Sequence, residues 1–157
     1  MNMTEGTEPT LIARTATPAD SRDLFEWRND AQTRAASRSI EPVMWEQHEL
    51  WFTGVLADKH RELYIVERVA DSEAVGMCRF DEGEGGLTEV SINLNPAFRG
   101  RGLSVGVLVA AIEKFRDGGG GALTATVRPE NTASIRVFEK AGFRRSASTP
   151  EFHTYLG

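Results

Sequence analysis

The 157-residue chain has few of the residues on which several classes of protein depend. It contains one cysteine, Cys78, and three histidines, His48, His60 and His153, which share no spacing suited to metal ligation. A lone cysteine excludes an internal disulfide and any multi-cysteine zinc site, so no bound metal is expected. Because Cys78 falls in a strand-like segment, we predict that it is a buried apolar residue.

Long hydrophobic runs and an excess of basic residues are also missing. The longest mostly apolar run, residues 103–112, is too short to cross a bilayer, and residues 1–10 lack the basic and apolar regions of a signal peptide. Eighteen Lys and Arg against 23 Asp and Glu give a net charge of −5, which makes nucleic acid an unsuitable partner. We expect a cytoplasmic protein without a membrane or nucleic-acid partner, with residues 1–9 as a mobile tail and residues 10–157 as one domain.

Apolar periodicity and turn residues predict an α+β fold. The expected strands cover residues 10–15, 63–69, 74–80, 87–94 and 122–127, with one or two edge strands in the last fifteen residues. Helices are expected from Pro18, from Pro42, from Leu103 and after Asn131, whereas the polar residues 32–40 predict a loop. This order gives a mixed, mostly antiparallel sheet of six to seven strands with about four helices and one β-α-β crossover over residues 87–127.

Glycines gather where the strand over 87–94 meets the helix that begins at Leu103. Gly100 and Gly102 stand there beside Arg99 and Arg101. Such a loop leaves backbone N–H groups free, and the helix start and the arginines add positive charge, so the segment suits a phosphate or pyrophosphate. A tight turn with two solvated arginines explains the same residues equally well.

Other motifs fit this loop less well. A dinucleotide fingerprint would need glycine at position 105, which is valine, and the Gly-Lys-Ser/Thr of a Walker loop does not occur. Residues 102–106 match the Gly-x-Ser-x-Gly nucleophile elbow, with Asp117 and His153 following in hydrolase order. However, no strand runs directly into Ser104, and the chain is short for that fold.

Two segments together resemble the cofactor motifs of the GNAT superfamily of N-acetyltransferases. Arg99-x-x-Gly102-x-Ser104 is similar to the family's Arg/Gln-x-x-Gly-x-Gly/Ala loop. Residues 129–143, Pro-Glu-Asn-x-x-Ser-x-x-x-Phe-Glu-Lys-x-Gly-Phe, are similar to its second cofactor segment. The motifs stand about thirty residues apart with a helix and a strand between them, as the family requires, and the resemblance covers approximately residues 10–147.

The resemblance implies acetyl-CoA as the acetyl donor. In this family the strand before the loop is bulged and splays from its parallel neighbour, so that the pantetheine arm pairs with the open edge. The cofactor contacts carry over onto the main chain of Leu94, onto the pyrophosphate loop of Arg99, Gly100, Arg101, Gly102, Leu103 and Ser104, and onto Asn131, Ser134 and Phe138. Asn131 also fits a helix N-cap with Ser134 at the third helical position.

One departure affects the expected chemistry. Phe138 stands where many relatives place a tyrosine that protonates the leaving thiolate, and phenylalanine has no proton to give. Another group or water then serves as the acid, or the thiolate leaves unassisted, with Tyr64 and Tyr155 as distant alternatives. For the oxyanion we expect a backbone N–H near Leu94, and for the base Glu89, with Asp81 as second choice.

The acceptor is expected in the N-terminal third, where this superfamily builds its variable site. The candidate contacts are aromatic and cationic: Trp27, Arg28, Arg34, His48, Trp51 and Arg79. Their pattern resembles the branch that acetylates nucleotide-linked aminosugars, as in pseudaminic acid pathways, and less closely the branches that act on protein N-termini and aminoglycosides. The tryptophans equally fit a core, and His48 a structural histidine.

The sequence therefore predicts an acetyl-CoA-dependent N-acetyltransferase that acts on a small amine, foremost a nucleotide-linked or free aminosugar, by direct transfer in a ternary complex. Two alternatives stay open, a protein N-terminal or lysine acetyltransferase and a non-catalytic acyl-CoA-binding module. A homodimer is compatible with the sequence.

Overall fold

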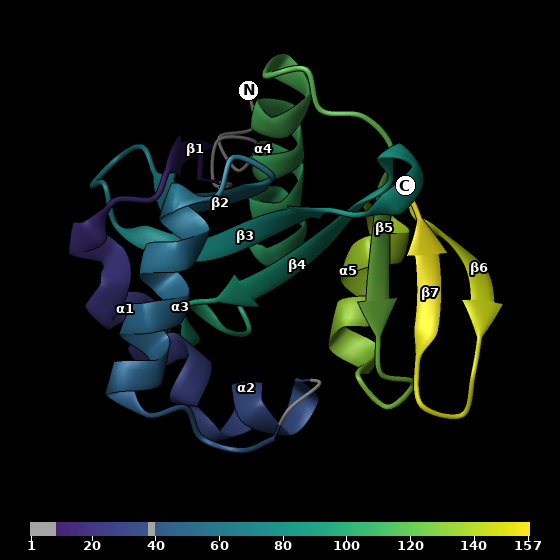
Figure 1. The fold of residues 1–157 in the computed structure, drawn as a ribbon, viewed down its shortest axis with the longest axis horizontal. Helices are drawn as coiled ribbons and strands as arrows, with labels where there is room; N and C mark the ends of the chain where they lie inside the picture. Colours follow the sequence, from purple (N-terminus) through teal and green to yellow (C-terminus); the bar gives the residue numbers. More distant parts are fainter. Residues whose placement is uncertain (1–8, 38–39) are drawn as a thin grey trace, which may run out of the picture.

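The computed structural model describes residues 9–37 and 40–157 and contains one seven-stranded sheet (Figure 1). Its order is β1-β2-β3-β4-β5-β7-β6, and all neighbours are antiparallel except β4 and β5. The strands are β1 (Leu11–Thr15), β2 (Arg61–Arg68), β3 (Ala74–Glu82), β4 (Thr88–Leu94), β5 (Leu123–Val127), β6 (Arg144–Ser148) and β7 (His153–Leu156). The predicted α+β class and the single crossover are confirmed. Residues 1–8 of the predicted tail lie outside the described residues.

Helices cover both faces of the sheet (Figure 1). They are α1 (Ser21–Asn29), α2 (Ala31–Ala36), α3 (Trp45–Ala57), α4 (Ser104–Asp117) and α5 (Thr132–Lys140). The larger core joins α4 and α5 to one face, around Phe80, Leu108 and Tyr155, and the smaller core joins α1 and α3 to the other, around Leu24, Phe52 and Ile65. Within the described part of the chain, no helix is both long enough and apolar enough to span a bilayer.

Helix α2 corrects the loop predicted over residues 32–40. Asp30 begins this helix, because its carboxylate accepts a hydrogen bond from the N–H of Thr33 at 3.1 Å. The Arg and Ser content of the segment favoured a loop, but its alanines are strong helix formers and the cap compensates for the missing apolar face. Residues 38–39 of the predicted loop lie outside the described residues.

Strands β4 and β5 pair only where they begin. The parallel register joins Thr88 to Leu123 and Glu89 to Thr124, and the strands then diverge (Figure 1), which confirms the predicted splay. The antiparallel register between β3 and β4 runs without a shift from Glu82 and Thr88 to the far end of β4. The bulge that the resemblance implied is therefore not found in this register, because β5 diverges while β4 stays paired with β3.

The divergence leaves one backbone edge of β4 open. The N–H of Asn95 donates to the carbonyl of Val75 at 2.8 Å, which places Asn93, two residues earlier, in a hydrogen-bonded pair with β3. Ile92 and Leu94 alternate with these residues, so their N–H and C=O groups are directed away from β3, towards the side from which β5 has diverged. An open edge of this kind can bind an extended segment as an added strand.

Gly76 of β3 lies opposite Leu94, at the point where β4 is open. A Cβ atom at position 76 would come within 2.9 Å of the carbonyl oxygen of Asn93 and within 3.1 Å of Cγ1 of Val107. The missing side chain therefore allows β4 to lie close to β3 and α4, and this contact fixes the position of the open edge.

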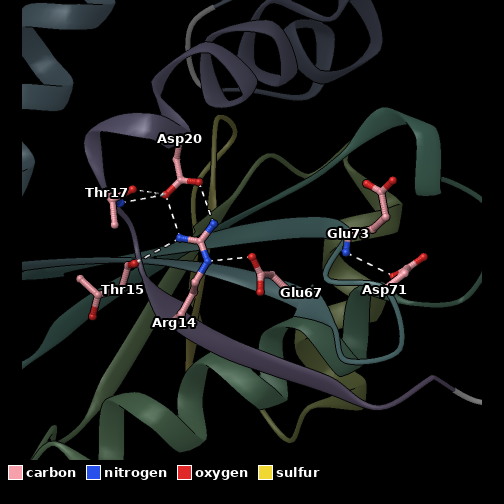
Figure 2. Close-up of polar contacts among 7 residues, drawn as sticks. All are labelled: Arg14, Thr15, Thr17, Asp20, Glu67, Asp71 and Glu73. Atoms are coloured by element: carbon pink, nitrogen blue, oxygen red, sulfur yellow. Dashed lines mark hydrogen bonds and ion pairs between the residues drawn. The ribbon is translucent and has the colours of Figure 1, made fainter.

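Arg14 joins β1, β2 and the turn that leads into α1 (Figure 2). Its Nε donates to Glu67 at 2.7 Å, and its two terminal nitrogens donate to the two carboxylate oxygens of Asp20 at 2.8 Å. Asp20 also accepts a hydrogen bond from the N–H of Thr17 at 2.8 Å. These contacts fix the path by which the chain leaves the sheet, and they set the position of α1 against it.

We expect Asp20→Asn to lower the free energy of unfolding at neutral pH by about 1.5–3 kcal/mol, the range for hydrogen bonds to charged groups. Burial alone would raise the pKa of Asp20, but the hydrogen bonds from Arg14 and Thr17 hold it below the ordinary value of 3.8. This contribution is therefore present above pH 3.8 and is lost as the pH falls through the lower folded-state value. Denaturant titrations of wild type and variant across this range measure the difference.

The matched control is Asp71→Asn, since Asp71 also pairs with an arginine, Arg68, but on an exposed turn. Exposed ion pairs contribute little, so this variant is expected to unfold nearly as the wild type does. Equal losses from both substitutions would contradict the role given to the Asp20 network.

Candidate active site

A cavity of about 520 Å³ is bounded by β3, β4, the end of β5 and parts of all five α-helices. This volume falls in the range of small-molecule sites. Most of the predicted site residues line it: Trp27, Arg28, Arg34, His48, Trp51, Arg79, Leu94, Arg99, Ser104, Asn131, Ser134 and Phe138. The lining does not include Glu89, Gly100, Arg101, Gly102 or Leu103. Sequence positions far apart therefore meet at one concave site.

The loop before α4 supplies free backbone N–H groups to the cavity region. Gly100 and Gly102 have positive φ angles of 73° and 70°, a conformation that glycine adopts without strain. Helix α4 begins at Ser104 without a side-chain cap, and the N–H of Val107 is bonded to the carbonyl of Leu103. The N–H groups of the first turn before Val107 have no acceptor within the helix. Free N–H groups at a helix N-terminus suit a pyrophosphate.

The two arginines of this loop have different surroundings. Arg99 reaches the start of α2, where it pairs with the carboxylate of Asp30 and donates to the hydroxyl of Thr33 at 3.1 Å. Burial would raise the pKa of Asp30, but the hydrogen bond from Arg99 lowers it. Arg101 is exposed and lies 5.1 Å from the ring centroid of Phe98. Arg99 thus links the loop to α2, and pyrophosphate contacts by either arginine stay a prediction.

Asn131 joins α5 to α2. Its side-chain oxygen accepts a hydrogen bond from the N–H of Ser134 at 3.1 Å, which confirms the predicted helix cap. Its Nδ2 donates to the carbonyl of Ala36 at 3.3 Å. Because Arg99 contacts the first residues of the same short helix, α2 is held from both cofactor segments and forms one wall of the cavity.

No tyrosine takes the place of Phe138. Phe138 is 3% exposed and packs edge-on against Phe143 while it lines the cavity. Tyr64 and Tyr155 are buried, and neither lines the cavity. Burial raises the pKa of Tyr64 to about 12, which makes its hydroxyl a weak acid. Both tyrosines therefore contribute to the core.

The polar face of β4 is directed to the side covered by α1 and α3. Glu89, Ser91 and Asn93 share this face, and Asn93 lies opposite Met77, which belongs to the smaller core. Ser91 and Asn93 line the cavity, whereas Glu89 lies two residues earlier, where β4 still pairs with β5. Ser91 and Asn93 were not among the predicted site residues, although the alternation over 87–94 placed them on the same face as Glu89.

Asp81, the second choice for a base, is engaged by two guanidinium groups. It accepts hydrogen bonds from Nε of Arg61 at 2.8 Å and from Nε of Arg79 at 2.7 Å. Its place directly opposite Glu89 in the sheet makes it part of a charged cluster on this face. Both of its oxygens therefore hold an arginine, and the choice of Glu89 as the base stays a prediction.

Part of the predicted acceptor wall belongs to the core. Trp27 is 6% exposed and His48 is fully buried, although both line the cavity. Nε2 of His48 lies 2.9 Å from the carbonyl oxygen of Ser21, to which a protonated Nε2 donates. Burial lowers the pKa of His48, so its neutral form is favoured. Trp51 is less buried, and its ring is the larger accessible aromatic surface on this wall.

The hydrolase alternative does not fit the structure. Ser104 begins α4, and His153 lies in β7, where its Nδ1 is 2.7 Å from the hydroxyl of Ser148. That hydroxyl is on the neighbouring strand β6. Among the residues that the structure describes, no group of three His, Cys, Asp or Glu side chains could hold a metal ion.

Because Cys78 is buried, we expect it to add no signal to a thiol assay of the native protein. Cys78 is fully buried in β3, as the sequence analysis predicted, and burial raises the pKa of its thiol. Since the thiolate is the reactive form, we expect no reaction of the native protein with a chromogenic disulfide reagent and one thiol per chain after unfolding. Reaction of the native protein at the rate of a free thiol would show that β3 opens readily.

Comparisons with known proteins agree with this geometry. The sequence model of the acetyltransferase (GNAT) domain family matches residues 10–144. The chain is 30% identical over 152 residues to an L-methionine sulfoximine/L-methionine sulfone acetyltransferase of Pseudomonas aeruginosa, covering 92% of this chain and 86% of the relative.

Solved structures share the fold. A domain from Methanocaldococcus jannaschii superposes with a TM-score of 0.81 at 20% identity, covering 96% of this chain and 99% of the domain. Spermidine N-acetyltransferase from Vibrio cholerae, solved in complex with CoA and spermine, superposes with a TM-score of 0.79 at 16% identity. The match covers 94% of this chain and 93% of that enzyme.

With its open β4 edge, its glycine loop and these matches, the chain belongs to the GNAT family of acetyltransferases. It is an N-acetyltransferase, and acetyl-CoA is its acetyl donor.

Proposed function

We propose that the acceptor is the primary amine of a small molecule, either an amino-acid derivative or an aminosugar, acetylated directly in a ternary complex. The observation that carries this proposal is one continuous cavity, which contains both Ser104 at the cofactor loop and Trp51 at the acceptor wall. The name of the Pseudomonas aeruginosa relative favours an amino-acid derivative. The pattern of tryptophans and arginines in the N-terminal third, which resembles that of nucleotide-aminosugar N-acetyltransferases, favours an aminosugar.

The size of the cavity favours a small acceptor over a peptide. Helix α2 forms one wall, and Arg99 and Asn131 hold it against the two cofactor segments. A volume of about 520 Å³ shared by donor and acceptor leaves room for a compact amine.

Each step of the transfer has a candidate group in this chain. Bound acetyl-CoA supplies an acetyl thioester, whose acyl carbon forms the new amide bond as the thiol leaves. We assign the polarisation of the carbonyl to the N–H of Leu94, on the open edge of β4. Glu89 takes the proton of the amine through a bridging water, since its side chain lies beyond the cavity lining. Phe138 donates no proton, so water protonates the thiolate.

Thiol release from acetyl-CoA tests this proposal with five acceptors: L-methionine sulfoximine, a UDP-linked aminosugar, kanamycin, spermidine and a peptide with a free N-terminus. We expect turnover with one of the first two. Turnover with the peptide alone would overturn the small-acceptor proposal, and acetyl-CoA binding without release for any acceptor would favour a binding module. The cytoplasmic location and the homodimer stay predictions.

A further inference from the structure

Two arginines converge on one tryptophan in the cavity wall. Arg28 comes from α1, Arg79 from β3 and Trp51 from α3, and all three line the cavity. The guanidinium carbons lie 5.4 Å and 5.5 Å from the ring centroid of Trp51. Contact with an aromatic ring can hold a guanidinium while leaving its N–H donors available.

The positive charge at this position is only partly balanced. Among residues 9–37 and 40–157, no carboxylate forms an ion pair with Arg28. Burial and the nearby charge of Arg79 both lower the pKa of Arg28. Asp81 accepts from Arg79 but also from Arg61, so a single carboxylate serves two guanidinium groups. Arg79 donates to Asp81 through Nε, and its terminal nitrogens can donate to a ligand.

The remainder of the cavity is also cationic. Three of the other described lining residues are arginines and one is acidic: Arg34, Arg99, which is paired with Asp30, Arg128 and Glu41. Arg34 donates from Nε to the carbonyl of Asn29 and from one terminal nitrogen to the carbonyl of Ile40, and neither bond neutralises its charge. A cavity with this lining attracts an anion and repels a polycation.

The arginines lie close to the expected reaction position. Arg79 is directly opposite Ser91 in the β3–β4 register, and side chains paired in this way are about 5 Å apart at Cβ. Ser91 lies between Glu89 and the open edge at Ile92 and Leu94. A single small acceptor could therefore place an anionic group on Arg28 and Arg79 and its amine at the thioester.

We propose that Arg28 and Arg79, held on Trp51, form an anion site that selects amine acceptors bearing a carboxylate or a phosphate. The proposal rests on the proposed function, because it assigns the acceptor of that same cavity. It also predicts that polyamines and aminoglycosides, which are cationic, are poor acceptors.

The test compares matched pairs of acceptors that differ in one anionic group. L-Methionine sulfone is compared with its carboxamide, and glucosamine 6-phosphate with glucosamine, by thiol release at saturating acetyl-CoA. We expect kcat/KM to be at least about tenfold higher for the anionic member of one pair, and the pair that shows it distinguishes carboxylate from phosphate. Equal values within both pairs would overturn the proposal while leaving acetyl transfer intact.

Substitutions assign the effect to the two arginines. Arg28→Gln is expected to lower kcat/KM for the anionic member about 10- to 100-fold and to leave the neutral member nearly unchanged, and Arg28→Lys is expected to restore part of the loss. The control is Arg22→Gln, because Arg22 is on the same helix and lies 4.3 Å from the ring centroid of Trp45, but does not line the cavity. If Arg28→Gln lowers kcat/KM equally for the anionic and the neutral acceptor, Arg28 has only a structural role.

A binding readout separates this proposal from the proposed function. Sodium sulfate is titrated into the protein saturated with CoA, so that the cofactor loop is occupied, and tryptophan fluorescence is followed. We expect a saturable change in wild type and in Arg22→Gln that is lost in Arg28→Gln and in Trp51→Phe. Absence of the change in wild type would overturn the anion site, whereas failure of every acceptor with sulfate still bound would overturn only the proposed function.

Discussion

Glu89→Gln is expected to lower kcat about 10²- to 10⁴-fold, the usual contribution of a general base, while KM for acetyl-CoA changes little. Glu89 shares the polar face of β4 with Ser91 and lies two positions before it, about 7 Å along the strand. From this position we expect its carboxylate to accept the amine proton through one water. Glutamine keeps the size of the side chain but is not a base. Steady-state rates of thiol release measure the effect.

The control for this substitution is Glu62→Gln, since Glu62 is an exposed carboxylate on β2 that does not line the cavity. Its kcat is expected to stay within about twofold of wild type, because substitutions remote from the site leave the barrier unchanged. A loss of less than about threefold in Glu89→Gln would assign the base to a different group. In that case Asp81 or bulk water would be the next candidate.

Phe80→Ala is expected to lower the free energy of unfolding by about 3–5 kcal/mol, a large share of the stability of one domain. Phe80 is 1% exposed, and its ring stacks on that of Phe115 with the centroids 4.4 Å apart. The ring centroid of Tyr64 lies 5.5 Å from that of Phe80. Removing it opens a cavity between the sheet and α4. For a chain of this length the melting temperature should fall by roughly 10 °C.

Leu50→Ala is the control for Phe80, because Leu50 is 79% exposed on α3 and its loss opens no cavity. Its effect is expected to stay within about 0.5 kcal/mol. Phe80 lies on the face of the sheet opposite α1 and α3, so KM for the acceptor at low temperature should be unchanged in Phe80→Ala. A loss of stability below about 1 kcal/mol would show that the larger core does not depend on the stacking of Phe80 on Phe115.

Sequence patterns predicted the parts of the site whose local residues determine local structure. The apolar repeat on α4 and the cap at Asn131 depend on neighbours within a few positions, so both were predictable. The glycine loop was predictable for the same reason. The identity of the cofactor, however, was inferred from the family resemblance, because loop chemistry alone indicated only a phosphate or pyrophosphate.

Contacts between distant segments were not predictable in this way. The pairing of Arg99 with Asp30, and of Asn131 with Ala36, joins positions about 70 and 95 residues apart and depends on how α2 packs. Neither local propensity nor periodicity carries that information. The sharing of Asp81 between two arginines likewise appears only once the register of β2 and β3 is known.

The most direct test of the account measures released thiol and N-acetylated product together, with acetyl-CoA and L-methionine sulfone or glucosamine 6-phosphate as acceptor. Because native Cys78 is buried, the thiol signal comes from CoA alone. We predict equal amounts of thiol and acetyl amide with an anionic acceptor, and loss of both in Glu89→Gln. Thiol release without an acetylated amine, or intact acetyl-CoA with every small amine tested, would contradict the account.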